Sequence, residues 1–324
     1  MRSLKMLASD FSNKQYPRDG FGHALLELGE KNKEVVVLTA GVSESVRTHW
    51  FAEKYPERFF QMGIAEQNMI GAAAGLSLVG KIPYASSFGS FMPARSFDQI
   101  RVSVCYNEAN VKLVSTHCGL NTGEDGASAQ MMEDISMMRA LPFMSVIAPC
   151  DYLETKKAVI AAADYPQSVY IRVGREKSPV ITTESTPFKI GKAEVFREGK
   201  DVTIVACGLM VLEALKAADE LAKENIKAEV INLHTIKPID EKTIISSAKK
   251  TGAVVTAEEH QIYGGMGSAV AEVLAKNYPV PMRMVAMNDT FGSSGKNDEL
   301  FRVYGLDARA IVRQVLSIKA SAKH

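Results

Sequence analysis

The sequence lacks the features that mark several large classes of protein. Its 38 Lys and Arg residues are balanced by 37 Asp and Glu residues, for a net charge of +1, so it has no basic excess for binding nucleic acid or an anionic membrane surface. No apolar run reaches the roughly 18 residues that a membrane-spanning helix needs. Residues Met1–Lys14 mix charges too freely for the apolar segment of a signal peptide. We therefore expect neither nucleic acid nor a membrane among its partners.

Cysteine is also scarce. The four cysteines are dispersed along 324 residues and form no C-x-x-C pair: Cys105, Cys118, Cys150 and Cys207. This spacing argues against a disulfide framework and against the common structural zinc motifs. Free thiols are typical of a reducing compartment, so the sequence predicts a cytoplasmic protein. The chain is long enough for two domains that each bury a core.

Short β-rich runs alternate with longer helical patterns, which favours crossover units and a mostly parallel sheet. In the first part of the chain, strands are predicted at Val35–Ala40, Ile82–Phe88, Val111–Thr116, Met144–Pro149 and Ser168–Val173. Helices are predicted between them at Glu66–Val79, Phe91–Tyr106, Met131–Leu141 and Tyr152–Ala163.

The stretch 178–187 is polar and contains two prolines, and we interpret it as a linker. A second alternation of strands and helices follows, and a helix is predicted to close the chain near Ala308–Ile318. The sequence therefore predicts an α/β fold made of two three-layer α/β/α domains with mostly parallel sheets. Their predicted bounds are residues 1–187 and 188–324.

A single carboxylate stands out at the start of a very apolar predicted helix. Glu66 lies within Gln61-Met-Gly-Ile-Ala-Glu-Gln-Asn-Met69 and precedes a run rich in alanine and glycine. One interpretation is a surface carboxylate that favours a helix N-terminus through the macrodipole. The other is a buried carboxyl group, because a carboxyl in apolar surroundings can stay protonated and donate a hydrogen bond at neutral pH.

Two further segments follow predicted strands. Phe88-Gly-Ser-Phe91 offers two aromatic rings, which are either plain core residues or a wall for a flat heteroaromatic ring. The loop Thr116–Gly126 carries His117 and, eight residues later, Asp125. Ligands bind where parallel strands end, so this loop is a candidate binding segment.

Together these segments resemble the pyrimidine-binding domain of the transketolase family of thiamine diphosphate enzymes. The resemblance implies that Glu66 is catalytic and protonates N1′ of the cofactor's aminopyrimidine. It implies that Ile64 holds the cofactor bent and that Phe88 and Phe91 wall the pyrimidine. A third aromatic usually lies three residues after the second, where this chain has Ala94.

The same resemblance implies a set of substrate contacts. His117 and Asp125 would bind the sugar hydroxyls, and His117 would also be catalytic. The sugar phosphate would be bound by Arg172, Arg18 and Ser45. Taken singly, each arginine is also consistent with a solvated surface group. Two family positions differ here: Ala129 replaces a substrate-contacting histidine and Gly41 replaces an aspartate. These losses point to an altered sugar or to reduced activity.

The chain has no match to the diphosphate-and-metal half of such a site. The family holds magnesium with a Gly-Asp-Gly segment and an asparagine about thirty residues later, but after Asn121 the next asparagine here is Asn225. We therefore expect no metal ligands on this chain. The resemblance implies an N-terminal, diphosphate-binding partner subunit that carries the Mg²⁺ ligands, in an α2β2 assembly with two-fold symmetry.

The predicted function is the C-terminal subunit of a split transketolase. With thiamine diphosphate it would transfer a two-carbon ketol unit from a ketose, with a sugar phosphate favoured, to an aldose acceptor. One alternative is a 2-oxoacid dehydrogenase E1 β-type subunit, although the pair His117 and Asp125 argues against it. Another is a non-catalytic regulatory paralogue, which retention of Glu66 argues against.

Overall fold

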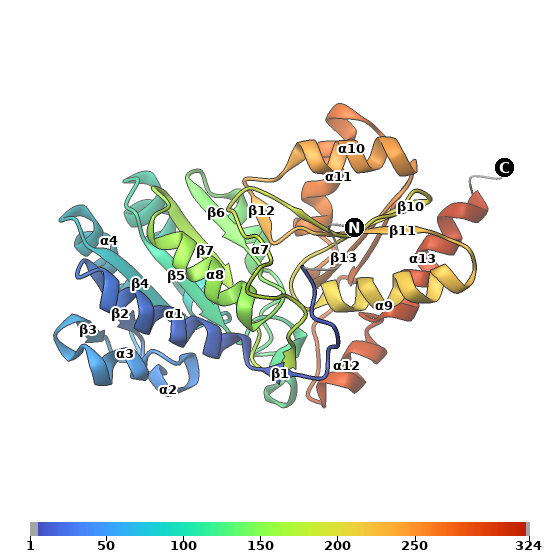
Figure 1. Cartoon of the computed structure of the whole chain (residues 1–324). Helices are drawn as coiled ribbons and strands as arrows, with labels where there is room; N and C mark the ends of the chain where they lie inside the picture. Colours follow the sequence, from blue (N-terminus) through green and yellow to red (C-terminus); the bar gives the residue numbers. More distant parts are fainter. Residues whose placement is uncertain (1–5, 322–324) are drawn as a thin grey trace.

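The computed structural model describes residues 6–321. Figure 1 shows two α/β halves side by side, each built around its own sheet. The first sheet has seven strands in the order β12-β6-β7-β5-β4-β2-β3, and the second has five in the order β14-β13-β10-β11-β9. A short antiparallel pair joins β1 (Lys14–Gln15) to β8 (Ser178–Pro179). The predicted α/β class with mostly parallel sheets is confirmed.

The first sheet is parallel except at one edge. Its strands are β2 (Val35–Thr39), β3 (Phe59–Gln61), β4 (Ile82–Phe88), β5 (Lys112–Thr116), β6 (Met144–Ile147), β7 (Ser168–Arg172) and β12 (Thr235–Lys237). The helical segments of this half are α1 (Pro17–Lys31), α2 (Ser43–Val46), α3 (His49–Lys54), η2 (Pro56–Arg58), α4 (Glu66–Leu78), α5 (Met92–Arg95), α6 (Phe97–Gln99), η3 (Ile100–Tyr106), η4 (Leu120–Asp125), α7 (Asp134–Ala140) and α8 (Tyr152–Ala163).

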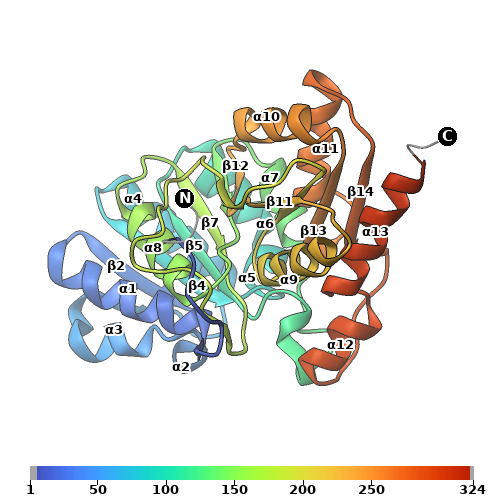
Figure 2. The ribbon, with the colours of Figure 1, turned by 45° about the vertical axis from the view of Figure 1, so that its right-hand side comes forward.

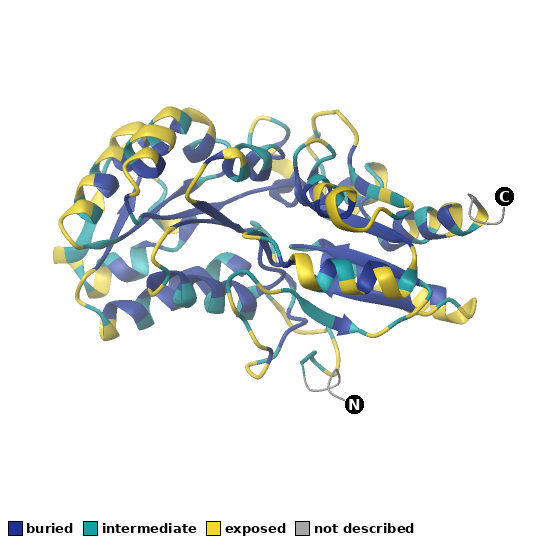
Figure 3. Cartoon of the chain, turned by 90° about the horizontal axis from the view of Figure 1, so that it is seen from above, coloured by how far each residue is buried: buried dark blue, intermediate teal, exposed yellow. Residues whose placement is uncertain are grey.

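Strand residues of the first sheet alternate between two apolar cores, as the period of two requires. Val35 and Val37 of β2 face α1 and α8, whereas Val36 and Leu38 belong to the core that includes α4 and α7. Figure 3 shows the resulting sandwich, with buried strands between helices whose outer faces are exposed. This half therefore has the predicted three layers.

The second sheet has α9 and α13 on one face and α10 and α11 on the other (Figure 2). Its strands are β9 (Glu194–Arg197), β10 (Val202–Ala206), β11 (Ala228–Asn232), β13 (Val254–Gln261) and β14 (Met282–Met287). The helices are α9 (Met210–Lys223), α10 (Glu241–Thr251), α11 (Met266–Asn277), α12 (Asn297–Val303) and α13 (Ala308–Ser321). Within residues 6–321, no helix combines the length and the apolar character needed to cross a membrane.

The two halves are more closely joined than a linker between them would suggest. Strand β12 comes from the C-terminal half of the chain but adds to the first sheet beside β6. The stretch 178–187 begins with strand β8, and Thr182 donates its hydroxyl and backbone N–H to the carboxylate of Asp151 at 2.8 and 2.6 Å. The stretch that we interpret as a linker is therefore bound to the first domain at Thr182.

One predicted helix is also broken up. The segment 91–106 forms two short α-helices, α5 and α6, followed by the π-helix η3. π-Turns are frequent near functional sites because they shift side chains out of helical register. Arg95, the last residue of α5, lies beside Glu66.

Candidate active site

Glu66 begins α4 and is buried, with 5% of its surface exposed. Its Oε1 lies 3.3 Å from Nη1 of Arg95, at the end of α5. Two residues earlier, the side chain of Ile64 is 85% exposed. A buried carboxyl group therefore lies two residues from an exposed apolar side chain.

Three rings stack on one another near the ends of β4 and β5. Phe88 and Phe91 stack with their centroids 5.4 Å apart, and His117 stacks on Phe88 at 3.8 Å. The guanidinium of Arg95 lies 4.3 Å from the centroid of the Phe91 ring. Arg95 thus contacts both Glu66 and Phe91, and it supplies a contact to this ring next to Ala94, where the family usually has an aromatic residue.

His117 is a neutral imidazole. Burial lowers its pKa to about 3, and the positive charges of Arg18, Arg175 and Arg47 contribute to this lowering. Its Nδ1 lies 2.8 Å from the hydroxyl of Thr116. Its backbone has φ 57°, a left-handed conformation that non-glycine residues adopt rarely. At neutral pH this side chain can donate or accept a hydrogen bond, but it does not carry a positive charge.

Asp125 lies at the end of η4 and is exposed. Its Oδ1 is 3.7 Å from Nη2 of Arg175, whose Nη1 donates to the carbonyl of Thr122 at 2.8 Å. Arg175 therefore joins Asp125 to the rest of the loop, and its charge also acts on His117. Arg175 is not among the site residues predicted from the sequence. Its signal was its position three residues after the end of β7, in the loop that follows a parallel strand.

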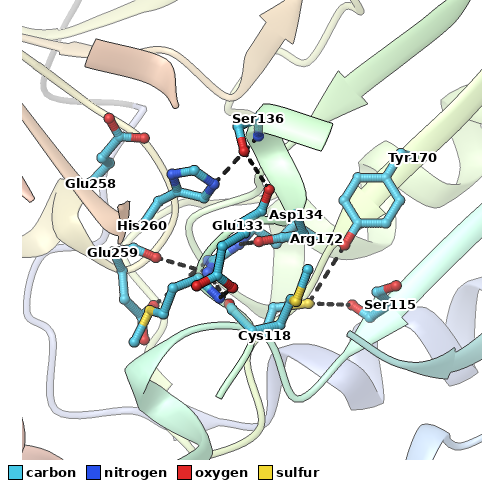
Figure 4. A network of polar contacts seen from close by, with 12 residues as sticks. Ser115, Cys118, Glu133, Asp134, Ser136, Tyr170, Arg172, Glu258, Glu259 and His260 are labelled. Carbon is cyan, nitrogen blue, oxygen red and sulfur yellow. Dashed lines mark hydrogen bonds and ion pairs between the residues drawn. The ribbon is translucent and has the colours of Figure 1, made fainter. Parts of the chain in front are cut away.

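Arg172, which we expected to bind the sugar phosphate, lies in a buried polar network. Its side chain is 6% exposed and its Nε lies 3.0 Å from Oδ2 of Asp134, which is fully buried. Its Nη2 donates to the carbonyls of Met131 and Glu259 at 3.2 and 2.7 Å. Tyr170 donates to the same Asp134 carboxylate at 2.8 Å. Figure 4 shows this network, in which the guanidinium of Arg172 binds Asp134 of the first half and Glu259 of the second.

Arg18 and Ser45 do come together. Nη1 of Arg18 donates to the carbonyl of Ser45 at 3.1 Å, so this contact involves the backbone of Ser45. The Nε of Arg18 is buried and has no hydrogen-bond partner in the described part of the chain. Arg18, Arg47 and Lys177 lie over the ring of Tyr16 at 4.9, 5.7 and 5.2 Å. Burial lowers the pKa of Arg18, and the charge of Arg47 lowers it further. Concentrated positive charge of this kind attracts an anion.

The two lost polar positions have different surroundings. Gly41 has φ 78°, and a Cβ there would lie 3.2 Å from Cγ1 of Ile64. Its N–H donates to Oε1 of Gln61 at 2.8 Å. Ala129 closes a turn in which its N–H donates to the carbonyl of Gly126 at 3.0 Å. A larger residue at position 41 would therefore press against Ile64.

The residues present fit the pyrimidine half of a cofactor site. A buried carboxyl group, two stacked rings and an exposed isoleucine can bind a flat, protonatable heteroaromatic ring. Within residues 6–321, no three His, Cys, Asp or Glu side chains are grouped so that they could hold a metal ion.

Comparison with known families gives two matches. Residues 14–180 match the family described as "Transketolase, pyrimidine binding domain", and residues 191–311 match "Transketolase, C-terminal domain". The fold and the arrangement of the site thus define a two-domain α/β protein of the transketolase type. The chain belongs to the transketolase family.

Several relatives have the length of this chain. A "Putative transketolase C-terminal section" of Methanocaldococcus jannaschii is 48% identical, over 92% of this chain and 95% of the relative. A 6-deoxy-6-sulfo-D-fructose transketolase subunit of Clostridium sp. is 45% identical, over 91% of this chain and 92% of the relative. An apulose-4-phosphate transketolase subunit of Phocaeicola vulgatus is 37% identical, over 92% of this chain and 96% of the relative.

Solved structures agree with this assignment. A chain described as "Split gene transketolase, inactive beta4 tetramer" superposes with a TM-score of 0.87 at 48% identity, covering 94% of this chain and 98% of that one. The transketolase of Campylobacter jejuni has a TM-score of 0.81 at 22% identity, which shows the shared fold. It covers 97% of this chain but 48% of that longer chain.

Proposed function

We propose that this chain is the pyrimidine-binding subunit of a thiamine diphosphate-dependent two-chain transketolase. In this proposal it transfers a two-carbon ketol unit from a ketose to an aldose, together with an N-terminal subunit that holds the diphosphate and Mg²⁺. The observation that carries the proposal is the buried carboxyl group of Glu66 beside the exposed Ile64 and the stacked pair Phe88 and Phe91.

Each residue of this site has a definite task in the proposed reaction. Bound cofactor supplies a carbon nucleophile for the ketose carbonyl. Glu66 would hold a proton at N1′ of the aminopyrimidine, because its carboxyl is shielded from water at the start of α4. Phe88 and Phe91 would stack on the pyrimidine ring. Ile64 would pack against the cofactor once the partner subunit encloses it.

The sugar would be read by the loop that follows β5. His117, as a neutral imidazole, would hydrogen-bond to the reacting oxygen of the sugar, and Asp125 would accept from a sugar hydroxyl. Arg175 replaces Arg172 in this proposal, since it is joined to Asp125 and acts on His117. Arg18 and the cations around Tyr16 would bind an anionic group at the far end of the sugar. A phosphate and a sulfonate both fit this charge.

The surface of α4 supports the need for a partner. From Phe59 to Gly80 the only charged residue is the buried Glu66. Gly71 and Gly75 are exposed in mid-helix, and a Cβ on either would meet nothing within 4 Å. Helix α4 therefore has no charged residue after Glu66, although Gln67 and Asn68 are exposed, and its exposed glycines would let another backbone approach closely. We therefore propose that α4 lies in the interface of the α2β2 complex, where the active site is completed.

The decisive experiment is purification of the complex from the source cells, followed by a ketol-transfer assay with Glu66→Gln. The wild-type complex with thiamine diphosphate and Mg²⁺ is expected to lengthen an aldose by two carbons, detected by mass spectrometry. Glu66→Gln is expected to lose at least about a hundredfold in rate, as is common when a catalytic acid–base group is removed, while still pairing with its partner.

Glu229→Gln is the matched control, since Glu229 of β11 is also buried but pairs with Lys250 of α10. Equal activity of Glu66→Gln and wild type would contradict a catalytic role and favour a regulatory subunit. Recovery of this chain without any partner or cofactor would point the same way. Turnover of a 2-oxoacid without sugar transfer would favour the dehydrogenase alternative. The relatives are named as transketolases, which supports the transketolase proposal.

A further inference from the structure

The loop that carries Asp125 is held in place by the second domain. Oε1 of Glu259, in β13, accepts from the backbone N–H of Asn121 at 2.5 Å. Ser294, in the segment before α12, donates its hydroxyl to the carbonyl of Glu124 at 2.6 Å. Gln130 bridges the two domains, because its Nε2 donates to the carbonyls of Gly123 and Ser293 at 3.1 and 2.9 Å. Helix α12 packs directly on η4.

Glu259 fills the space beneath the start of this loop. Gly119 has φ 80°, and a Cβ there would lie 2.4 Å from the carboxyl carbon of Glu259. The backbone turns at this glycine so that the next N–H groups point at the carboxylate. A side chain larger than glycine at this position would push the loop away from Glu259.

A short chain of contacts leads from Glu259 to the backbone carbonyl of His117. Glu259 holds the backbone of Asn121, and the hydroxyl of the next residue, Thr122, donates to the carbonyl of His117 at 2.9 Å. His117 needs such support, because its left-handed backbone is rarely adopted without it. The carbonyl of Thr122 in turn accepts from Arg175, which reaches Asp125. The loop therefore orients three candidate substrate-binding residues together: His117, Asp125 and Arg175.

Glu259 is itself fixed by Arg172. Nη2 of Arg172 donates to the Glu259 carbonyl at 2.7 Å, and Nη1 lies 3.8 Å from its Oε2. On its other side Arg172 pairs with Asp134 of α7 (Figure 4). The carboxylate of the neighbouring Glu258 is directed elsewhere, since it accepts from the N–H groups of Met266 and Gly267 at the start of α11.

We propose that Glu259 is a positioning residue of the second domain that holds the loop Leu120–Asp125 in its substrate-reading geometry. Docking of the second domain then sets the affinity for the sugar, although Glu259 itself does not touch the substrate. The role assigned to the loop rests on the proposed function, whereas the holding of the loop is a property of this chain and can be measured without turnover.

The ionisation state of Glu259 should change how tightly it binds the loop Leu120–Asp125. Burial raises its pKa to about 7, against the opposing effects of Arg172 from β7 and the loop N–H groups of Asn121 and Leu120. Asp134 from α7 faces it as well and favours the protonated form. Because the loop N–H groups favour the carboxylate, linkage requires that the carboxylate bind the loop more tightly than the carboxylic acid does. The loop should therefore loosen as the pH falls below about 7.

The test is hydrogen exchange of amides 117–126 in the full chain at pH 6 and pH 8, corrected for the intrinsic pH dependence of exchange. At pH 8, Glu259→Gln is expected to speed exchange about tenfold or more, as for one lost charge-assisted hydrogen bond, and to abolish the difference between the two pH values. Glu258→Gln is the matched control, since it lies in the same strand and is equally buried. It is expected to affect the start of α11 and leave the loop unchanged.

Thr122→Val gives a second variant on the first-domain side of the same chain of contacts. It should speed exchange at His117 and Cys118 without altering β13. In the complex, both Glu259→Gln and Thr122→Val should raise KM for the sugar more than they lower kcat. Wild-type loop exchange in Glu259→Gln at pH 8, or equal loosening by Glu258→Gln, would overturn the proposal. A wild-type complex that transfers no ketol unit would instead overturn the proposed function and leave the exchange result standing.

Discussion

Replacing Arg172 or Arg175 by methionine should have opposite consequences, although the two arginines lie three residues apart. Arg172→Met leaves the fully buried Asp134 without its cation. Breaking a buried ion pair from one side costs about 3–5 kcal/mol in the free energy of unfolding. At ~2–4 °C per kcal/mol for a chain of this order of size, the thermal midpoint of the isolated chain should fall by roughly 6–20 °C.

Arg175→Met removes a pair that is partly exposed and 3.7 Å long. Such pairs contribute about 1 kcal/mol or less, so its thermal midpoint should stay within a few degrees of wild type. In the assembled enzyme, however, Arg175→Met should raise KM for an anionic sugar about tenfold or more, as expected for loss of a hydrogen bond to a charged group.

Scanning fluorimetry of the isolated chain and steady-state kinetics of the complex separate these two effects. Arg172→Lys is a useful third variant, because it keeps the charge but loses the planar fork that reaches Asp134 and Glu259 together. An unchanged thermal midpoint for Arg172→Met, together with a raised KM, would refute the structural role of Arg172 and return it to the substrate site.

Three further predictions concern the cofactor face and the imidazole. Gly71→Leu on α4 should leave the isolated chain folded, since its side chain would meet open space, but it should prevent assembly as judged by native mass spectrometry; an intact complex would exclude α4 from the interface. Ile64→Ala should leave the thermal midpoint unchanged, since Ile64 is exposed, and should weaken thiamine diphosphate binding by the complex in calorimetry; unchanged binding would count against its contact with the cofactor. The C2-proton resonance of His117 should not shift between pH 5 and pH 8, since its pKa is lowered to about 3. Because the unfolded chain binds this proton more tightly, His117 should cost stability as the pH falls below its ordinary value of 6.5; a titration step near pH 6.5 would contradict the neutral imidazole.

The sequence alone determined the fold class and the family. Alternating apolar runs specify strands and helices locally, so β2, β4 and α4 begin where they were predicted. The segment around Glu66 is contiguous, and its resemblance to the transketolase family needed no information about distant contacts. The domain bounds at 187 and 188 remain a prediction, and β12 shows that the two halves share a sheet edge.

Only the tertiary structure distinguishes the surroundings of Arg172 from those of Arg175. The two residues lie three positions apart in the sequence. Arg172, at the end of β7, contacts Glu259 of the second domain, whereas Arg175, in the loop after β7, contacts Asp125. The contact of Arg95 with Glu66 joins residues 29 positions apart. The hold of Glu259 on Asn121 joins residues 138 positions apart. Burial and pairing depend on residues that are distant in sequence, and no local pattern contains them.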